Sequence, residues 1–324
     1  SRLAAGYVIQ LMEFLSNALR SKVDETLTHP DVRRVRDRNL ALWATADSEK
    51  FEELLSEWES EIKERMNRLR GTEEKPIISI VIPARNEERK ILQILDSISN
   101  QQLKDPLEVI IVNNNSSIND RTGEIANACG ARLIQYTLKD DNPDRGLSQI
   151  ALARQKGLKQ ASGKYIISTD ADGIVTNHWV EKMIEPLKKD TSIICTTGHV
   201  INYDRKDALF VVPLDAATMI GRPIANMAKV RPSVVTLGAN TAFRRADALE
   251  IGGYDERIYP GEDTDIGMRL SKFGRVKFIT GYEAAVRVSS RRLSQGRFFD
   301  VLKHYTGADK SLYKNTEGKV KNFR

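Results

Sequence analysis

Several features are rare or absent in this sequence of 324 residues, and each absence excludes a class of protein. Only two cysteines occur, Cys129 and Cys195, so there is neither a disulfide framework nor a cysteine-rich metal site, and a reducing compartment is favoured. No run of about eighteen apolar residues is present, which excludes an ordinary transmembrane helix. No secretory leader follows Ser1. We therefore expect a cytoplasmic protein, with peripheral contact to the inner face of the membrane as an option.

Two nucleotide-binding motifs are also missing. No Gly-x-Gly-x-x-Gly follows the first expected strand, which argues against a nicotinamide-dependent oxidoreductase. No Gly-x-x-x-x-Gly-Lys-Ser/Thr occurs, which argues against a P-loop NTPase.

The net charge of +6 is unevenly distributed along the chain. Residues 287–324 hold 10 basic and 3 acidic residues, a net of +7, so this end accounts for nearly all the excess. A basic end suits an anionic lipid surface, a phosphorylated substrate or nucleic acid, or is simply a solvated tail. We prefer the tail for residues 314–324 and expect no nucleic-acid partner.

Residues 1–75 carry a helical pattern and no strand signal. Apolar side chains recur at helical spacing in two stretches: Tyr7, Val8, Leu11, Met12, Leu15 and Leu19, then Phe51, Leu54, Leu55, Trp58, Ile62, Met66 and Leu69. Asp47 or Ser48 caps the start of the second helix, and Gly71 ends it. We expect an all-helical extension packed on the main body or on a partner chain, such as a second copy. The intervening Arg33, Arg34, Arg36 and Arg38 are expected to form a solvated helix face.

The pattern changes at residue 76 to strands that alternate with helices. Strands are expected over residues 77–82, 107–112, 132–136, 164–169 and 283–288, with helices at 91–98, 121–129 and 147–161 among the connections. This order predicts an α/β domain with a mainly parallel sheet over 76–290. Residues 291–324 are expected to form a basic C-terminal helix and tail.

Three of these strands end in polar clusters, at residues 83–87, 113–117 and 170–172. With right-handed crossovers, these ends lie along one edge of the sheet, where α/β proteins bind ligands. The cluster after the fourth strand contains Asp170 and Asp172, whose oxygens suit Mg²⁺ or Mn²⁺. A solvated turn that uses Asp for its turn chemistry is the alternative.

Five motifs occur in the order of a known family. They are Pro83-Ala84-Arg85-Asn86-Glu87, Asp170-Ala171-Asp172, Gly238-Ala239-Asn240-Thr241, Gly252-Gly253-Tyr254-Asp255-Glu256 and Gly261-Glu262-Asp263. Together with Arg154 on the expected 147–161 helix, they resemble family 2 of the glycosyltransferases over roughly residues 77–290. The resemblance implies the GT-A fold, which is Rossmann-like, with a mainly parallel central sheet flanked by helices.

The resemblance also implies an activity. Such enzymes transfer a sugar from a nucleotide-diphosphate donor to an acceptor hydroxyl with inversion, assisted by Mn²⁺ or Mg²⁺. The positions that match the donor-binding residues are Pro83, Ala84, Arg85, Glu87, Asn114, Arg154, Asp170 and Ala171. Asp172 is the metal ligand implied by the resemblance, with Asp170 on the metal or the ribose. Arg154 either adds a fixed charge at the phosphates or forms a surface salt bridge.

The sequence departs from the family pattern at two places. An acidic residue is common after the second strand, where this chain has Asn113-Asn114-Asn115, and this leaves the donor base open. Many relatives add a C-terminal His to the metal, whereas residues 289–292 contain none and His304 lies further on. Arg291 or Arg292 could instead contact phosphate.

The acidic run at residues 262–265 is expected to open a helix. By resemblance, Asp263 is the general base that takes the acceptor's proton, and Glu262 is the alternative. Acidic residues also occur at helix starts simply because they suit the helix dipole. Rival interpretations of the whole chain are a sugar nucleotidyltransferase, and a non-catalytic nucleotide-sugar-binding or scaffold protein.

The sequence indicates less about how an acceptor would bind. Residues 207–232 form an apolar stretch that suits a lipid-linked acceptor or plain core. The Gln-x-x-Arg-Trp motif of processive synthases is absent, so we expect single-sugar transfer to a glycan or lipid-linked acceptor.

Overall fold

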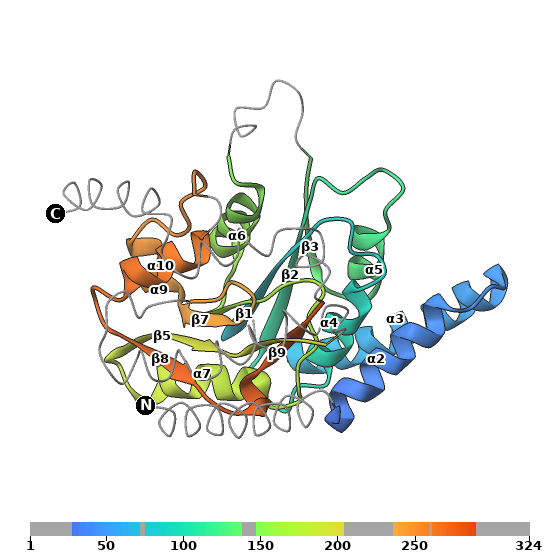
Figure 1. Ribbon diagram of the computed structural model, residues 1–324, viewed down its shortest axis with the longest axis horizontal. Helices are drawn as coiled ribbons and strands as arrows, with labels where there is room; N and C mark the ends of the chain where they lie inside the picture. The colour runs from blue at the N-terminus through green and yellow to red at the C-terminus, as the bar shows by residue number, and fades with distance from the viewer. Residues whose placement is uncertain (1–27, 72–74, 138–146, 204–235, 259–260, 290–324) are drawn as a thin grey trace, which may run out of the picture.

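The structure, a computed structural model, describes residues 28–71, 75–137, 147–203, 236–258 and 261–289 (Figure 1). Three features considered above lie outside these residues: the expected helix over 7–19, the apolar stretch 207–232, and the basic end 291–324, which contains Arg291, Arg292 and His304. Within the described residues, no helix is both long and apolar enough to cross a bilayer.

A seven-stranded sheet forms the centre of the molecule, in the order β3-β2-β1-β4-β7-β5-β8 (Figure 1). The strands are β1 (Ile78–Ala84), β2 (Leu107–Asn114), β3 (Arg132–Tyr136), β4 (Tyr165–Ser168), β5 (Ile193–Gly198), β7 (Thr241–Arg244) and β8 (Arg275–Ile279). All neighbouring pairs are parallel except those of β7, which runs antiparallel to both β4 and β5. A second, two-stranded sheet pairs β6 (Val200–Asn202) with β9 (Val286–Val288). The expected mainly parallel α/β fold is confirmed.

Helices cover both faces of the central sheet (Figure 1). They are α4 (Ile91–Ser99), α5 (Thr122–Ala128), α6 (Gln149–Gln160), α7 (Trp179–Lys189), α9 (Arg245–Glu250) and α10 (Glu262–Leu270). Alternate strand residues face opposite layers, as the pleat requires: Ile80 and Ile82 of β1 pack in the cluster with α4 and α7, whereas Val81 packs with α6 and α10. Both cysteines are buried, and burial raises the pKa of each thiol.

The last strand is shorter than predicted. The expected strand over 283–288 is wrong for its first half, where a 3-10 turn, η2 (Tyr282–Ala284), precedes β9. Gly281 has φ of 109°, which interrupts an extended path, and the fully buried Arg287 donates to the carbonyl oxygens of Tyr282 and Ala285. The turn is therefore held closed by a side chain of the strand that follows it.

The described part of the extension consists of α2 (Pro30–Trp43) and α3 (Ser48–Arg70), which pack on α4 (Figure 1). The predicted caps are confirmed, since the Asp47 carboxylate accepts from the Lys50 amide at 2.8 Å and Gly71 is the C-cap. The apolar stripe Leu55, Trp58, Ile62 and Met66 is buried in the same core cluster as α4 and β1.

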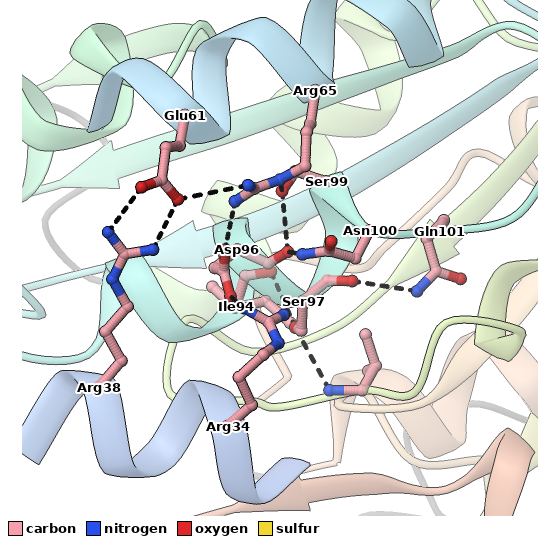
Figure 2. A network of polar contacts seen from close by, with 11 residues as sticks. Arg34, Arg38, Glu61, Arg65, Ile94, Asp96, Ser97, Ser99, Asn100 and Gln101 are labelled. Carbon is pink, nitrogen blue, oxygen red and sulfur yellow. Dashed lines mark hydrogen bonds and ion pairs between the residues drawn. The ribbon is translucent and has the colours of Figure 1, made fainter. Parts of the chain in front are cut away.

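All four arginines of the expected solvated face on α2 are at least partly exposed, but two of them also pair with residues of other helices. Arg34 reaches the fully buried Asp96 of α4 at 3.0 Å, and Arg38 pairs with Glu61 of α3 at 2.6 Å (Figure 2). Arg33 and Arg36 each pair with Asp37 of the same helix, on the surface. Two arginines of this face therefore connect α2 to neighbouring helices while their side chains remain partly exposed.

Candidate functional site

Three strands bring their polar ends to one edge of the sheet. In the parallel register, Ala84 lies opposite Asn113, and Val81 lies opposite Ser168, the last residue of β4. The segments that follow β1, β2 and β4 therefore start side by side at the carboxyl edge, as the sequence predicted.

The segments after β1 and β2 are tied to each other by hydrogen bonds. The Asn86 amide donates to Ser116 Oγ at 2.9 Å, and Asn86 Oδ1 accepts from the Ser117 amide at 2.8 Å. Asn86 adopts φ of 54°, a conformation that asparagine tolerates. The Glu87 amide donates to Thr122 Oγ1 at 2.7 Å. The two segments thus form one unit, from which the side chain of Arg85 is exposed.

Asn114, at the end of β2, supplies a buried polar group to this edge. Its side chain donates to the carbonyl oxygen of Gln149, at the start of α6, at 2.6 Å. Its Oδ1 is buried and accepts no hydrogen bond from the residues that the structure describes. Such an atom retains an acceptor for a bound N–H group.

Arg154 of α6 joins the two acidic clusters of the site. Its guanidinium lies 2.7 Å from Asp170 Oδ1 and 3.5 Å from Glu262 Oε1, and it donates to Ser168 Oγ at 3.0 Å. Only 2% of the side chain is exposed, so the interpretation as a surface salt bridge is wrong. Burial lowers the pKa of Arg154, but the charges of Asp170 and Glu262 more than offset this and hold the pKa above its ordinary value.

The acidic run opens α10, as predicted, and its first two carboxylates differ in environment. Asp263 is half-buried, and its carboxylate accepts from the Gly238 amide at 2.6 Å and from the Thr264 amide at 2.8 Å. Glu262 is buried, and burial, followed by the charge of Asp263, raises the pKa of Glu262 to about 7. One carboxylate is thus held in place by amides, and its neighbour titrates near neutral pH.

The Asp170–Asp172 pair suits a hard cation by ligand type. Both side chains carry carboxylate oxygens, which Mg²⁺ and Mn²⁺ prefer, and Asp172 is 3% exposed. The described residues contain no group of three or more His, Cys, Asp or Glu side chains arranged to hold a metal. Asp170, the first carboxylate of the pair, is also the one that contacts Arg154.

Three residues that hold the site together were not among the sequence candidates. Ser168 accepts from Arg154, and the Gly238 amide binds Asp263. A Cβ on Gly238 would lie 2.1 Å from the Arg154 guanidinium, so any larger residue here would displace that guanidinium. Gln155 binds the Gly252 carbonyl and the Tyr254 amide and so fixes the double-glycine turn. Gly238 and Gly252 lie in two of the ordered motifs, so the sequence did mark these two positions. No local pattern marks Ser168 or Gln155 as part of the site.

Comparisons with known proteins give a consistent family. A family profile described as "Glycosyl transferase family 2" matches residues 79–251. The chain is 28% identical over 230 residues to the "Probable glycosyltransferase YdaM" of Bacillus subtilis, covering 69% of this chain and 51% of that protein. It is 31% identical over 140 residues to "Glycosyltransferase GlyG" of Streptococcus pneumoniae, covering 41% and 42%. The chain thus spans about half the length of the curated relatives it matches.

Solved structures give weaker similarities. Staphylococcus aureus TarS in complex with UDP is 18% identical, with a TM-score of 0.49, over 65% of this chain and 60% of that one. Glucosyl-3-phosphoglycerate synthase from Mycobacterium tuberculosis, in complex with Mn²⁺ and UDP-glucose, is 21% identical, with a TM-score of 0.46, over 69% and 73%.

Proposed function

The chain belongs to glycosyl transferase family 2, and from this premise we propose that it transfers one sugar from a nucleotide-diphosphate donor to an acceptor hydroxyl, with inversion at the anomeric carbon. The observation that carries the proposal is the buried Arg154, which contacts both Asp170 after β4 and Glu262 at the start of α10. This contact supports the proposal that the donor residues and the acidic run with the proposed base form one site. The acceptor in this proposal is a glycan or a lipid-linked sugar.

The donor side is built from the three strand ends. We assign Pro83, Ala84, Arg85 and Glu87 after β1, Asn114 of β2, and Asp170 with Ala171 after β4 to the nucleotide. The buried Oδ1 of Asn114 supports this assignment, because it leaves an acceptor for an N–H group of the base. Arg154 holds Asp170 in place and contributes positive potential to the phosphates.

The Asp170 and Asp172 carboxylates would hold Mn²⁺ or Mg²⁺. When bound there, the cation would offset negative charge on the diphosphate. Two carboxylates leave ligand positions open for phosphate oxygens, which is the usual arrangement for these metals with nucleotides.

Asp263 is the proposed general base. One amide donor on each carboxylate oxygen fixes its orientation, the residue is partly exposed, and each oxygen retains a lone pair that can accept the proton. The acceptor oxygen bonds to the anomeric carbon as its proton moves to Asp263, the bond from the anomeric carbon to the diphosphate oxygen breaks, and nucleoside diphosphate leaves. Glu262, which is buried against Arg154, tunes the electrostatics of the site and is the alternative base.

Binding and transfer measurements test this function. UDP- and GDP-sugars are titrated by calorimetry with and without Mn²⁺, and transfer or hydrolysis of the donor is followed by release of nucleoside diphosphate. We expect metal-dependent binding that Asp172→Ala abolishes, and an Asp263→Asn variant that binds donor normally but loses turnover. Pyrophosphate release from a nucleoside triphosphate and a sugar phosphate would instead identify a nucleotidyltransferase. Binding without any turnover would identify a non-catalytic protein.

A further inference from the structure

Helices α2 and α3 precede the family match, which starts at residue 79, and α2 contacts both segments that carry the proposed donor residues. One of these segments runs from the end of β1 to α4 and includes Arg85 and Glu87. The other runs from Asp170 to the start of α7 at Trp179.

The first contact lies between α2 and the segment after β1. Asn39 is 3% exposed, and its side-chain amide donates to the carbonyl oxygen of Arg89 at 3.0 Å. The Arg89 guanidinium in turn lies over the ring of Trp43, the last residue of α2, at 5.3 Å. Arg89 is two residues beyond Glu87, so α2 fixes the far end of this segment.

The second contact lies at the opposite, N-terminal end of α2. Asp31, in the first turn of α2, accepts a hydrogen bond from the Asn177 amide at 3.1 Å. Val32 and Val35 of the same helix belong to the same small buried apolar cluster as Ile174. Asp31 and Asn39 are eight positions apart, about 12 Å along a helix axis, so α2 works as a spacer of fixed length between the two segments.

A buried ion-pair network seats α2 and α3 on α4. Asp96 of α4 is fully buried and is bound by Arg34 of α2 at 3.0 Å and by Arg65 of α3 (Figure 2). Arg65 also donates to Ser99 Oγ at 2.9 Å. A buried carboxylate of this kind is costly unless its partners stay in place. The ion pairs therefore fix where the two helices lie on the body, whereas apolar burial alone would only favour their association.

Residues in α4 and just after it also form hydrogen bonds with the second segment. Ser97, next to Asp96, accepts from the Val175 amide at 3.3 Å. The side chain of Gln101, two residues beyond the end of α4, donates to the Thr176 carbonyl oxygen at 2.6 Å. The segment after Asp172 is thus held from two sides, by α2 directly and by α4.

We propose that α2 is a positioning element for the donor site, in which Asn39 and Asp31 hold the two donor-side segments at a fixed separation. The proposal rests on the proposed function and adds a role for residues outside the family match. Segments held in their binding conformation lose less freedom when the nucleotide binds, so the contacts contribute to donor affinity and not to the chemical step. Asn39 and Asp31 are positioning residues, not catalytic ones.

The test measures UDP and GDP binding with Mn²⁺, donor KM and kcat, and hydrogen exchange of peptides spanning 86–91 and 173–180. For Asn39→Ala and Asp31→Ala we expect donor affinity to fall about tenfold with kcat within about twofold, and faster exchange in the peptide that each residue contacts. Asp31→Asn retains an acceptor oxygen and should restore affinity. Arg38→Gln, which removes the Arg38–Glu61 pair within the extension but no contact to either segment, is the matched control.

Different results would overturn different claims. If the wild type binds nucleotide and both alanine variants bind it equally well, with unchanged exchange, the positioning role is wrong and the proposed function stands. A loss shared equally with Arg38→Gln also refutes it, because it would reflect general weakening of the extension. If the wild type binds neither UDP nor GDP and turns over none of the nucleotide sugars tested, the proposed function fails, and the positioning role fails with it.

Discussion

At the scale of single residues, Glu262 couples stability to pH. Its pKa of about 7 in the folded protein exceeds the ordinary value of 4.5, because burial and the nearby Asp263 disfavour its charge. Between these pH values the folded state binds more protons than the unfolded state, so this group costs stability as pH rises. We expect Glu262→Gln to be more stable than wild type by about 3 kcal/mol at pH 8, with the difference vanishing near pH 4. Urea unfolding across this range measures it; a difference independent of pH would contradict the assignment.

A substitution at Arg154 tests the contribution of the positive charge in the same cluster. Replacing Arg154 with Met leaves Asp170 and Glu262 without their shared cation in a buried site, so we expect a loss of about 3–5 kcal/mol in unfolding free energy, with weaker donor binding. Arg257→Met is the control, because Arg257 pairs with Asp255 on the surface, where such pairs contribute about 1 kcal/mol or less. Equal losses in the two variants, measured by chemical unfolding, would show that Arg154 does not organise the site.

At the scale of elements, the turn between α6 and β4 sets how the Arg154 helix meets the sheet. Gly163 lies in this turn, and a Cβ there would come within 2.7 Å of the backbone of Ile78 and Ser79. Backbone cannot move aside cheaply, so we expect Gly163→Ala to cost about 1–3 kcal/mol in thermal or chemical unfolding. Ser162→Ala, at an exposed neighbour whose backbone amide makes its own bond to Glu108, should be nearly neutral. Equal stability of the two variants would mean that the turn is adaptable.

Elements were predictable from sequence where the signal is local. Strands β1 to β4 and helices α3 and α6 follow from apolar periodicity, caps and breakers, and lie within one or two residues of the expected bounds. The roles of Arg34 and Arg38 were not predictable, because their partners Asp96 and Glu61 lie on other helices, 62 and 23 residues away. A polar residue such as Asp96 within the apolar pattern of α4 carries no local sign that it is buried.

The candidate site was predictable to a similar extent. The edge of the sheet and the clusters at 83–87 and 170–172 follow from strand order, which chain topology restricts strongly. The bridge through Arg154 to Glu262 did not follow, because it depends on how α6 and α10 approach across the edge, a tertiary geometry that no local pattern encodes. The sequence could therefore nominate the groups of the site but not their mutual contacts.

At the scale of the whole molecule, the described part of the extension and the body share one hydrophobic core. Trp58 of α3 is 1% exposed and belongs to the same cluster as Trp179 of α7, on the body. A domain with its own core could unfold separately, but helices whose apolar stripe completes another element's core unfold with it. We expect the extension and the body to unfold in a single transition.

The tryptophans allow this to be measured directly, since Trp43, Trp58 and Trp179 are the only three in the chain. A Trp43→Phe/Trp179→Phe variant reports on α3 through Trp58, and a Trp43→Phe/Trp58→Phe variant reports on the body through Trp179. Each variant has its own stability, so its fluorescence midpoint in urea is compared with the circular dichroism midpoint of the same sample. We expect the two to coincide in both variants. Earlier loss of the Trp58 signal than of the circular dichroism signal would show that the extension detaches first, and would contradict both the shared core and the seating of α2 and α3 through Asp96.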